Sequence, residues 1–264
     1  MSAFLYLYCL LPADTPADVV GITGIDGRAV RLERVAGFTA AVSEVGEDFA
    51  EGTLNERIRD LDWLSPRAVQ HHEVVDALYT QTKHVLPLSF GAIFRDPASL
   101  AERLTQQRRQ LAATLEDLCG KEEWNLKLVR DEGVFFPALR EHSPELRSLT
   151  AAVSTEAPGK AFMLRKKQQA AEGGEARRVT AEVRERVFKE LAAYAAKTHR
   201  DALVAPAEGS DVRLELRASY LVQETAAVGL KNASERLSIE YAPLGFRLEL
   251  TGPWPPFTFA GSLA

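Results

Sequence analysis

Apolar residues in the first part of the chain gather in short runs that end at Pro or Gly. Phe4 to Leu11 is a continuous apolar and aromatic run stopped by Pro12, which is typical of a buried strand. Residues 30–35 and 38–45 flank Ala36-Gly37, and this spacing predicts a hairpin with a short turn. Three strands are therefore expected before any long helix.

Two helix starts are predicted next from caps followed by proline. A short helix is expected from Thr53 to about Leu61, and Ser65-Pro66 then reads as an N-cap with proline in the first turn. Asp96-Pro97 repeats this signal before a stripe of leucines that ends at Gly120. Between the two helices, residues 85–94 are extended and apolar, and their Pro and Gly predict an edge position or a bend.

In the second part of the chain, Trp124 to Val129 alternates apolar and polar residues, as a half-buried strand does. The helical section that follows is expected to break at Pro137, Pro144, Pro158-Gly159 and Gly173-Gly174. Its most helix-prone parts, 160–171 and 176–200, are rich in Ala, Glu, Lys and Arg. Large apolar residues are scarce there, so we expect a pair of projecting, solvated helices rather than core helices.

The remaining pattern gives a short strand at 202–206, a clear strand at 212–222, a helix at 225–241 and a last alternating strand at 246–250. Val228, Leu237 and Ile239 are expected among the apolar positions of that helix. The order from Trp124 onward is strand, helices, strand, strand, helix, strand, which is the βαββαβ order of a ferredoxin-like unit.

The predicted fold class is therefore α+β. We expect an N-terminal α+β domain at 1–122 and a ferredoxin-like domain at 123–251, with an extended helical insertion at about 135–201. Residues 252–264 form a separate tail rich in proline and aromatic residues.

The tail is the most unusual stretch of the sequence. In Gly252-Pro-Trp-Pro-Pro-Phe-Thr-Phe259, each proline fixes φ and removes a backbone donor, so the segment is stiff and mostly extended. Trp254, Phe257 and Phe259 offer a large apolar area at small entropic cost. Two interpretations remain open: the tail packs on the chain's own body, or it holds a partner.

Composition narrows the possible partners. The 264-residue chain carries a net charge of −5 and has no clustered basic face, so neither nucleic acid nor a membrane surface is an expected partner. No segment reaches the roughly 18 apolar residues that a membrane helix needs. Cys9 and Cys119 lie far apart among apolar neighbours, and we expect two buried thiols in a reducing, cytoplasmic protein.

The candidates for chemistry each have a simpler structural interpretation. His71-His72-Glu73 lacks the i, i+4 spacing of a helical metal site, so a structural role for the histidines is favoured and no metal is predicted. The glycines of 21–27 are not followed by the Lys-Ser/Thr pair of a phosphate loop. No serine has a nucleophile-elbow sequence around it. We therefore expect no enzyme and no cofactor.

Several of these motifs resemble those of one known family. The Pro-Leu-Ser-Phe-Gly run at 87–91, the preceding helix with Arg67 and 71–74, the strand at 219–222, and above all the Gly-Pro-Trp-Pro-Pro ending look like the gas vesicle protein F/L family (GvpF/GvpL). The likeness covers nearly the whole chain. One departure is Ser89, where the family's Pro-Leu-Arg-Phe-Gly version has a basic residue.

The resemblance implies a non-enzymatic accessory protein of gas vesicle formation, located in the cytoplasm or on the vesicle. It also implies two α+β domains, and as partners the hydrophobic shell protein GvpA and other accessory Gvp proteins. The alternative from another class is a ligand-sensing or enzymatic domain on a ferredoxin-like scaffold. The basic cluster of the helical arm is either a solvated face or a docking surface. The residues expected at a partner or at the domain junction are Leu88, Phe90, Phe94, Arg165, Lys166, Lys167, Trp254, Phe257 and Phe259.

Overall fold

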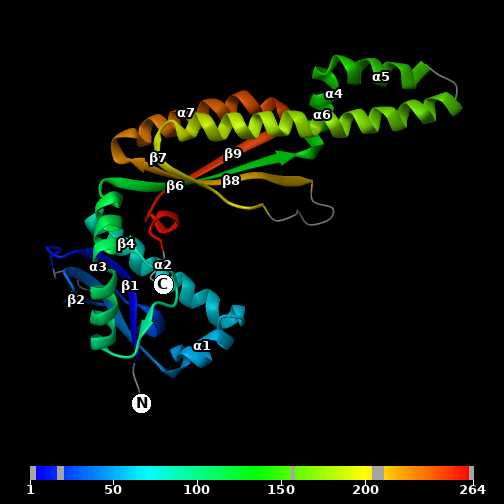
Figure 1. Cartoon of the computed structure of the whole chain (residues 1–264). Helices are drawn as coiled ribbons and strands as arrows, with labels where there is room; N and C mark the ends of the chain where they lie inside the picture. The colour runs from blue at the N-terminus through cyan, green and yellow to red at the C-terminus, as the bar shows by residue number, and fades with distance from the viewer. Residues whose placement is uncertain (1–3, 17–20, 156–157, 204–210, 262–264) are drawn as a thin grey trace. The chain divides into compact units, whose positions relative to one another are not determined.

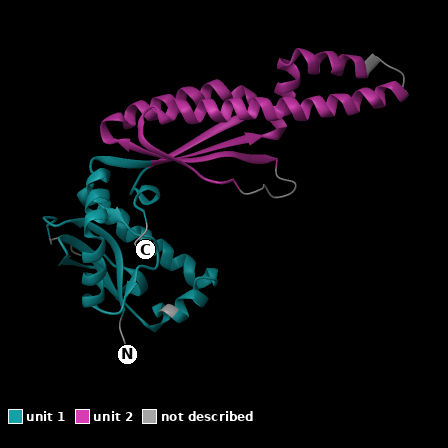
Figure 2. Cartoon of the chain, in the orientation of Figure 1, with its two compact units in different colours: residues 1–123, 253–264 teal, residues 124–252 magenta. Residues whose placement is uncertain are grey.

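The computed structural model describes residues 4–16, 21–155, 158–203 and 211–261. The chain forms two compact units: unit 1 consists of residues 1–123 together with 253–264, and unit 2 of residues 124–252 (Figure 2). Each unit combines helices with a β-sheet, so the predicted α+β class is confirmed. The chain passes from unit 1 to unit 2 and returns, so the tail belongs to the compact unit in which the chain began.

The sheet of unit 1 is built around its first strand, β1 (Phe4–Pro12). Strand β3 (Phe38–Val45) pairs with one edge of β1, and β2 (Arg31–Val35) pairs with β3 as the predicted hairpin. Ala36 and Gly37 both have positive φ, 51° and 86°, as a two-residue hairpin turn requires. The remaining edge of β1 carries two short strands, β4 (Leu86–Pro87) and β5 (Ile93–Phe94).

The predicted apolar run at 85–94 is therefore two edge strands and not one. Residues 88–92 lie between them, and Gly91 has a φ of 97° that few other residues adopt. Because β1 is paired on both edges and covered on both faces, its run from Leu5 to Leu11 is buried throughout. That double coverage is why the sequence there is continuously apolar instead of alternating.

Helices α1 (Glu51–Arg57), α2 (Leu61–Thr82) and α3 (Pro97–Leu118) complete unit 1 (Figure 1). The start of α3 is as predicted, with Asp96 as N-cap in a capping box and Pro97 in the first turn. The predicted start of α2 at Ser65 is wrong. Asp60 caps this helix by accepting from the backbone N–H groups of Asp62 and Trp63, and Pro66 lies inside it, where it removes one backbone hydrogen bond.

Unit 2 is a four-stranded sheet in the order β7-β8-β6-β9, with helices packed against it. Its strands are β6 (Lys121–Asp131), β7 (Ala195–Arg200), β8 (Val212–Gln223) and β9 (Phe246–Trp254). The sequence of elements is strand, helices, strand, strand, helix, strand, in the predicted order; the ferredoxin-like assignment stays a prediction. Strand β9 lies at a sheet edge, where Pro253 is tolerated.

The helices of unit 2 are α4 (Glu132–His142), α5 (Pro144–Thr155), α6 (Pro158–Ala192) and α7 (Ala227–Tyr241). Figure 1 shows α6 and α7 side by side over the sheet, with α5 lying along the N-terminal half of α6. The hydrophobic core lies between these helices and the strands. Trp124, Phe135, Leu191, Tyr220 and Phe246 are among its buried members.

Four sequence expectations for this region are wrong. The helix break predicted at Pro137 does not occur, because this proline lies inside α4. Helix α6 runs through Gly173-Gly174 without a break, because two glycines cost only about 1 kcal/mol each and the helix packs on both sides of them. It ends at Ala192, and the next residues form β7, which pairs with β8. Its second half is a core helix, since Val183 and Val187 are buried. The strand predicted at 202–206 falls largely on 204–210, outside the described residues.

Single residues also differ from expectation. Cys9 is buried as predicted, but Cys119 is exposed because it follows the last turn of α3 at the surface. On α7, Leu237 is buried, while Val228 and Ile239 point to solvent. Periodicity alone did not separate these two from the apolar face of the helix.

Candidate partner-binding site

The tail is fixed to unit 1 by a carboxylate. Glu123, which is buried, accepts from the backbone N–H of Thr258 at 2.9 Å and from its hydroxyl at 2.7 Å. Two hydrogen bonds from one residue to the two oxygens of a single carboxyl group hold a short segment in one position. Pro255, Pro256 and Ala260 are buried around this contact.

The aromatic residues of the tail have different surroundings. The ring of Phe257 lies 4.5 Å from that of His72 and 6.0 Å from that of His71, measured between centroids, and joins the apolar cluster of unit 1. Phe259 is half-buried in the short 3-10 turn Phe257–Phe259. Trp254 is 44% exposed at the end of β9. Packing on the chain's own body therefore describes Phe257, while Trp254 presents much of its ring to solvent.

Beneath Phe257 lies a buried polar network centred on His71. Its Nε2 lies 2.9 Å from the carbonyl oxygen of Leu88, and its Nδ1 lies 2.9 Å from the hydroxyl of Tyr6. A carbonyl only accepts, so Nε2 donates to Leu88 and Nδ1 accepts from Tyr6, which defines the neutral tautomer. The Tyr6 hydroxyl in turn accepts from the N–H of Gly91 at 3.1 Å. The network thus connects β1 and α2 to residues 88–91.

Burial, followed by the neighbouring His72, lowers the pKa of His71 to about 4. Burial likewise raises the pKa of Tyr6 above its ordinary range. Both groups are therefore neutral near pH 7, and the network holds no net charge. His71 thus has the structural role that was expected for the two histidines. Among the described residues, no group of three or more His, Cys, Asp or Glu side chains is arranged to hold a metal ion.

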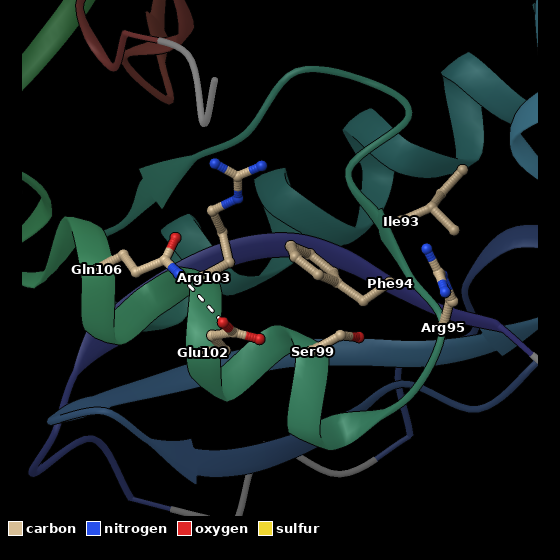
Figure 3. Close-up of a pocket in the computed structure, with 7 residues that line it drawn as sticks. All are labelled: Ile93, Phe94, Arg95, Ser99, Glu102, Arg103 and Gln106. Atoms are coloured by element: carbon tan, nitrogen blue, oxygen red, sulfur yellow. Dashed lines mark hydrogen bonds between the residues drawn. The ribbon is translucent and has the colours of Figure 1, made fainter.

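A groove of about 530 Å³ opens beside the β5 edge of the same sheet. Figure 3 shows Ile93 and Phe94 on one side and, on the other, Ser99, Glu102, Arg103 and Gln106 along the first turns of α3. These helix residues share one face because they recur every three or four positions. The capping box at Asp96 fixes where α3 begins, and it thereby aligns this face with the strand.

The chemistry of the groove is mixed. Phe94 is half-buried and supplies an apolar floor, Arg95 and Arg103 supply positive charge, and Glu102 accepts from the Gln106 side chain at 3.2 Å. Strand β5 pairs with β1 through Phe94 and Leu5, so its main-chain groups lie at the rim of the sheet. An edge strand next to a groove is suited to an extended segment of another protein.

The other predicted site residues are divided between the units. Leu88 is buried, with its carbonyl taken by His71, and Phe90 is half-buried against the rings of Tyr6 and Phe49. Arg165, Lys166 and Lys167 are exposed on α6 in unit 2, next to the exposed Phe162 and Met163. Leu88, Phe90, Phe94 and Phe257 thus belong to unit 1, and the basic cluster belongs to unit 2.

Sequence reasoning missed Glu123 and Thr258, the pair that anchors the tail. A buried acidic residue directly before Trp124 in an apolar strand was the available signal, because an unpaired buried carboxylate is costly and predicts a partner. The separation of the two residues in the chain hid that partner from any local motif.

The fold and the groove define a class: an α+β protein of two compact units whose candidate site is an open groove at a sheet edge. The structure is similar over 98% of its length to the crystal structure of gas vesicle protein GvpF from Anabaena, with a TM-score of 0.74 and 18% identity, covering 99% of that chain. GvpF from Microcystis aeruginosa gives a TM-score of 0.67 at 19% identity, covering 99% of this chain and all of that one. At these identities the likeness shows the fold.

The sequence comparisons show the family. The model of gas vesicle synthesis protein GvpL/GvpF matches residues 4–261. Gas vesicle protein L from a Streptomyces species is 33% identical over 247 residues, covering 91% of this chain and 86% of the relative. Gas vesicle protein L2 from Halobacterium salinarum is 28% identical, covering 97% and 90%. The chain belongs to the GvpL/GvpF family and has a role in gas vesicle formation.

Proposed function

We propose that the protein is a non-catalytic assembly factor that binds the hydrophobic shell protein GvpA and other accessory Gvp proteins in the cytoplasm. The family match over residues 4–261 carries this proposal. Among the described residues, no helix combines the length and apolar character needed to cross a bilayer. A shell protein that is largely apolar must be kept from aggregating before it enters the vesicle wall, and a covering partner prevents that aggregation.

The groove beside β5 is the surface that we assign to the shell protein. Its apolar floor at Phe94 and the sheet edge beside it match an extended apolar segment, which gains main-chain pairing and side-chain burial together. A specific interface covers roughly 1,000 Å² or more, so the groove supplies the centre and the surrounding surface the rest. The aromatic ring of Trp254 is a second contact available in unit 1.

The test is a pull-down of the shell protein by the purified full chain, under conditions where the shell protein stays soluble. Phe94→Ser is expected to reduce capture at least about tenfold, since hot-spot aromatics contribute 2 kcal/mol or more. The matched control is Val69→Ser, which makes an exposed apolar position of the same unit polar outside the groove.

Failure of the unmodified chain to capture the shell protein contradicts the proposed function. Equal capture by Phe94→Ser and Val69→Ser contradicts the assignment of the groove and leaves the function standing. The alternative of a ligand-sensing or enzymatic domain predicts no capture in either case.

A further inference from the structure

Unit 2 contains a larger hollow of about 630 Å³ with a different chemistry. It lies between α6, the start of β8 and the junction of β6 with α4, so all its walls belong to one unit. On α6 the lining residues Ala176, Arg177, Thr180, Ala181 and Arg184 recur every three or four positions and therefore form one helical face. The alanines leave space, and the arginines extend along its sides.

The side chains that line this hollow carry a net positive charge. Four arginines and two glutamates line it. Glu132 pairs with Arg130 at 3.3 Å and with Arg213, and Glu215 pairs with Arg130 at 3.1 Å. The two carboxylates are therefore already neutralised by two of the arginines.

Arg130 is held by several groups of unit 2, although its Nε makes an ion pair with Glu215 without the alignment of a hydrogen bond. It is buried, its guanidinium lies 4.4 Å from the ring centroid of Phe135, and it donates to the hydroxyl of Thr180 at 2.9 Å. The Arg130 side chain is therefore rigid, and its charge is neutralised by the two glutamates. It forms one wall of the hollow and is not the group that binds an incoming anion.

The surplus charge sits on Arg177 and Arg184. Neither lies within ion-pair distance of a carboxylate in the described parts of the chain, and the charge of Arg184 acts only at longer range on Glu185, which is paired with Arg200. The Nε of Arg184 is buried and lacks a hydrogen-bond partner among the described residues. A buried donor without an acceptor costs free energy, and an acceptor supplied by a ligand removes that cost. These two arginines lie two turns apart on α6 and line the same space.

We infer that this pocket binds an acidic segment of a partner protein, whose carboxylates are held by Arg177 and Arg184. Carboxylate groups match the planar donor fork of arginine, and the apolar walls at Phe136 and Leu214 suit the carbon chain that carries them. A phosphate dianion fits less well, because it has no carbon chain to pack against the apolar walls at Phe136 and Leu214. The partner segment is thus acidic and amphipathic.

The experiment measures binding of a labelled helical peptide of Leu, Ala and Glu to the full chain by fluorescence anisotropy. The expected result is saturable binding that weakens at least about tenfold in the Arg177→Gln/Arg184→Gln double variant, as the loss of charge-assisted bonds requires. The Arg184 Nε–H signal in a two-dimensional nitrogen–proton spectrum is expected to shift when the peptide is added.

Arg178→Gln is the matched control. Arg178 is the neighbour of Arg177 on the same helix, but it is exposed and pairs with Glu175 and Glu182, so its loss is expected to leave peptide binding unchanged. The peptide with Gln in place of Glu is expected not to bind.

Three results overturn the inference. The first is no saturable binding of the acidic peptide up to about 1 mM, and the second is equal weakening by Arg178→Gln and by the double variant. The third is displacement of the peptide by inorganic phosphate at equal or lower concentration, which would assign the pocket to a phosphate ligand. None of these results depends on whether the shell protein is captured by unit 1.

Discussion

The two units stabilise buried polar groups in opposite ways. In unit 1, the network of Tyr6, His71 and the main chain of residues 88–91 is neutral, because burial keeps the Tyr6 and His71 side chains uncharged. In unit 2, Arg130 lies buried among Glu132 and Glu215 as a full ion pair. Neutral networks are sensitive to protonation, and buried ion pairs are sensitive to the loss of one partner.

This difference predicts which change destabilises each unit. A neutral network fails when pH forces a charge into it, whereas an ion-pair network fails when one charge is removed and the other remains buried. Trp63 lies in the core of unit 1 and Trp124 in that of unit 2. Variants that retain only Trp63 or only Trp124 of the three tryptophans therefore report on each unit separately.

The largest expected effect is at Arg130. Replacing it with Ala leaves Glu132 short of one partner and Glu215 without its ion pair, which is expected to destabilise unit 2 by about 3–5 kcal/mol. Urea unfolding followed by Trp124 fluorescence measures this change. Arg178→Ala serves as control, since Arg178 is exposed, and its midpoint should stay close to that of the unmodified protein. Equal midpoints for both variants would show that the buried network is not a stabilising element.

The second effect is a pH dependence confined to unit 1. Unfolded His71 takes up a proton as pH falls through its ordinary pKa of 6.5, while the folded side chain stays neutral down to a pKa of about 4. Stability is therefore complete above pH 6.5 and is lost as pH falls toward 4, by on the order of 3 kcal/mol. Urea midpoints from Trp63 fluorescence at a series of pH values measure the loss.

Unit 2 is expected to lose stability only at lower pH. The hydrogen bond from Arg140 lowers the pKa of Glu172 below its ordinary value of 4.5, so its contribution is present above 4.5 and is lost as pH falls through the lowered pKa. His71→Gln should flatten the profile of unit 1 and leave the profile of unit 2 unchanged. A fall of the Trp124 midpoint between pH 6.5 and 4.5 would contradict the contrast between the units.

A smaller effect separates the two aromatics of the tail. Phe257→Ala is expected to destabilise unit 1 by about 2 kcal/mol, because its half-buried ring packs on His72. Trp254→Ala should cost less than about 1 kcal/mol despite the larger ring, since Trp254 is 44% exposed. Thermal unfolding of the two variants measures the difference, and the reverse order would show that Trp254 is the residue that fixes the tail.

The smallest effect is expected on the surface of unit 2. Arg186 and Arg236 bridge Glu190 and Glu240 between α6 and α7. These pairs are exposed to solvent, which screens them, so Arg236→Gln should barely shift the unfolding midpoint and the shift should vanish at high salt. A large shift of the unfolding midpoint that does not depend on salt would show that this surface network stabilises unit 2 in the same way as the buried network at Arg130.

Sequence reasoning succeeded where the signal was local. The run from Phe4 to Leu11, the turn at Ala36-Gly37 and the cap at Asp96 each determine their structure within a few residues. The helix start predicted at Ser65-Pro66 is wrong because Asp60, only a few residues earlier, is an equally good N-cap, and the helix begins there.

Prediction failed where distant parts of the chain decide the structure. Ala195 to Arg200 continues the helical composition before it, but pairing with β8 makes it a strand. The pocket on unit 2 is assembled from α4, α6, β6 and β8, and no spacing along the chain brings Arg130, Arg177 and Arg213 together. The order of helices and strands could therefore be predicted from the sequence, whereas the charged pocket of unit 2 could not.

The bond between Glu123 and Thr258 spans 135 positions of the chain. During synthesis the tail is made after unit 2, so unit 1 stays unfinished until all of unit 2 has been made. A chain cut short anywhere in unit 2 leaves the Glu123 carboxylate without Thr258 and the His72 ring without Phe257. Completion of the first unit thus reports that all of unit 2 has been translated, and an incomplete chain is expected to be the preferred substrate of cellular proteases.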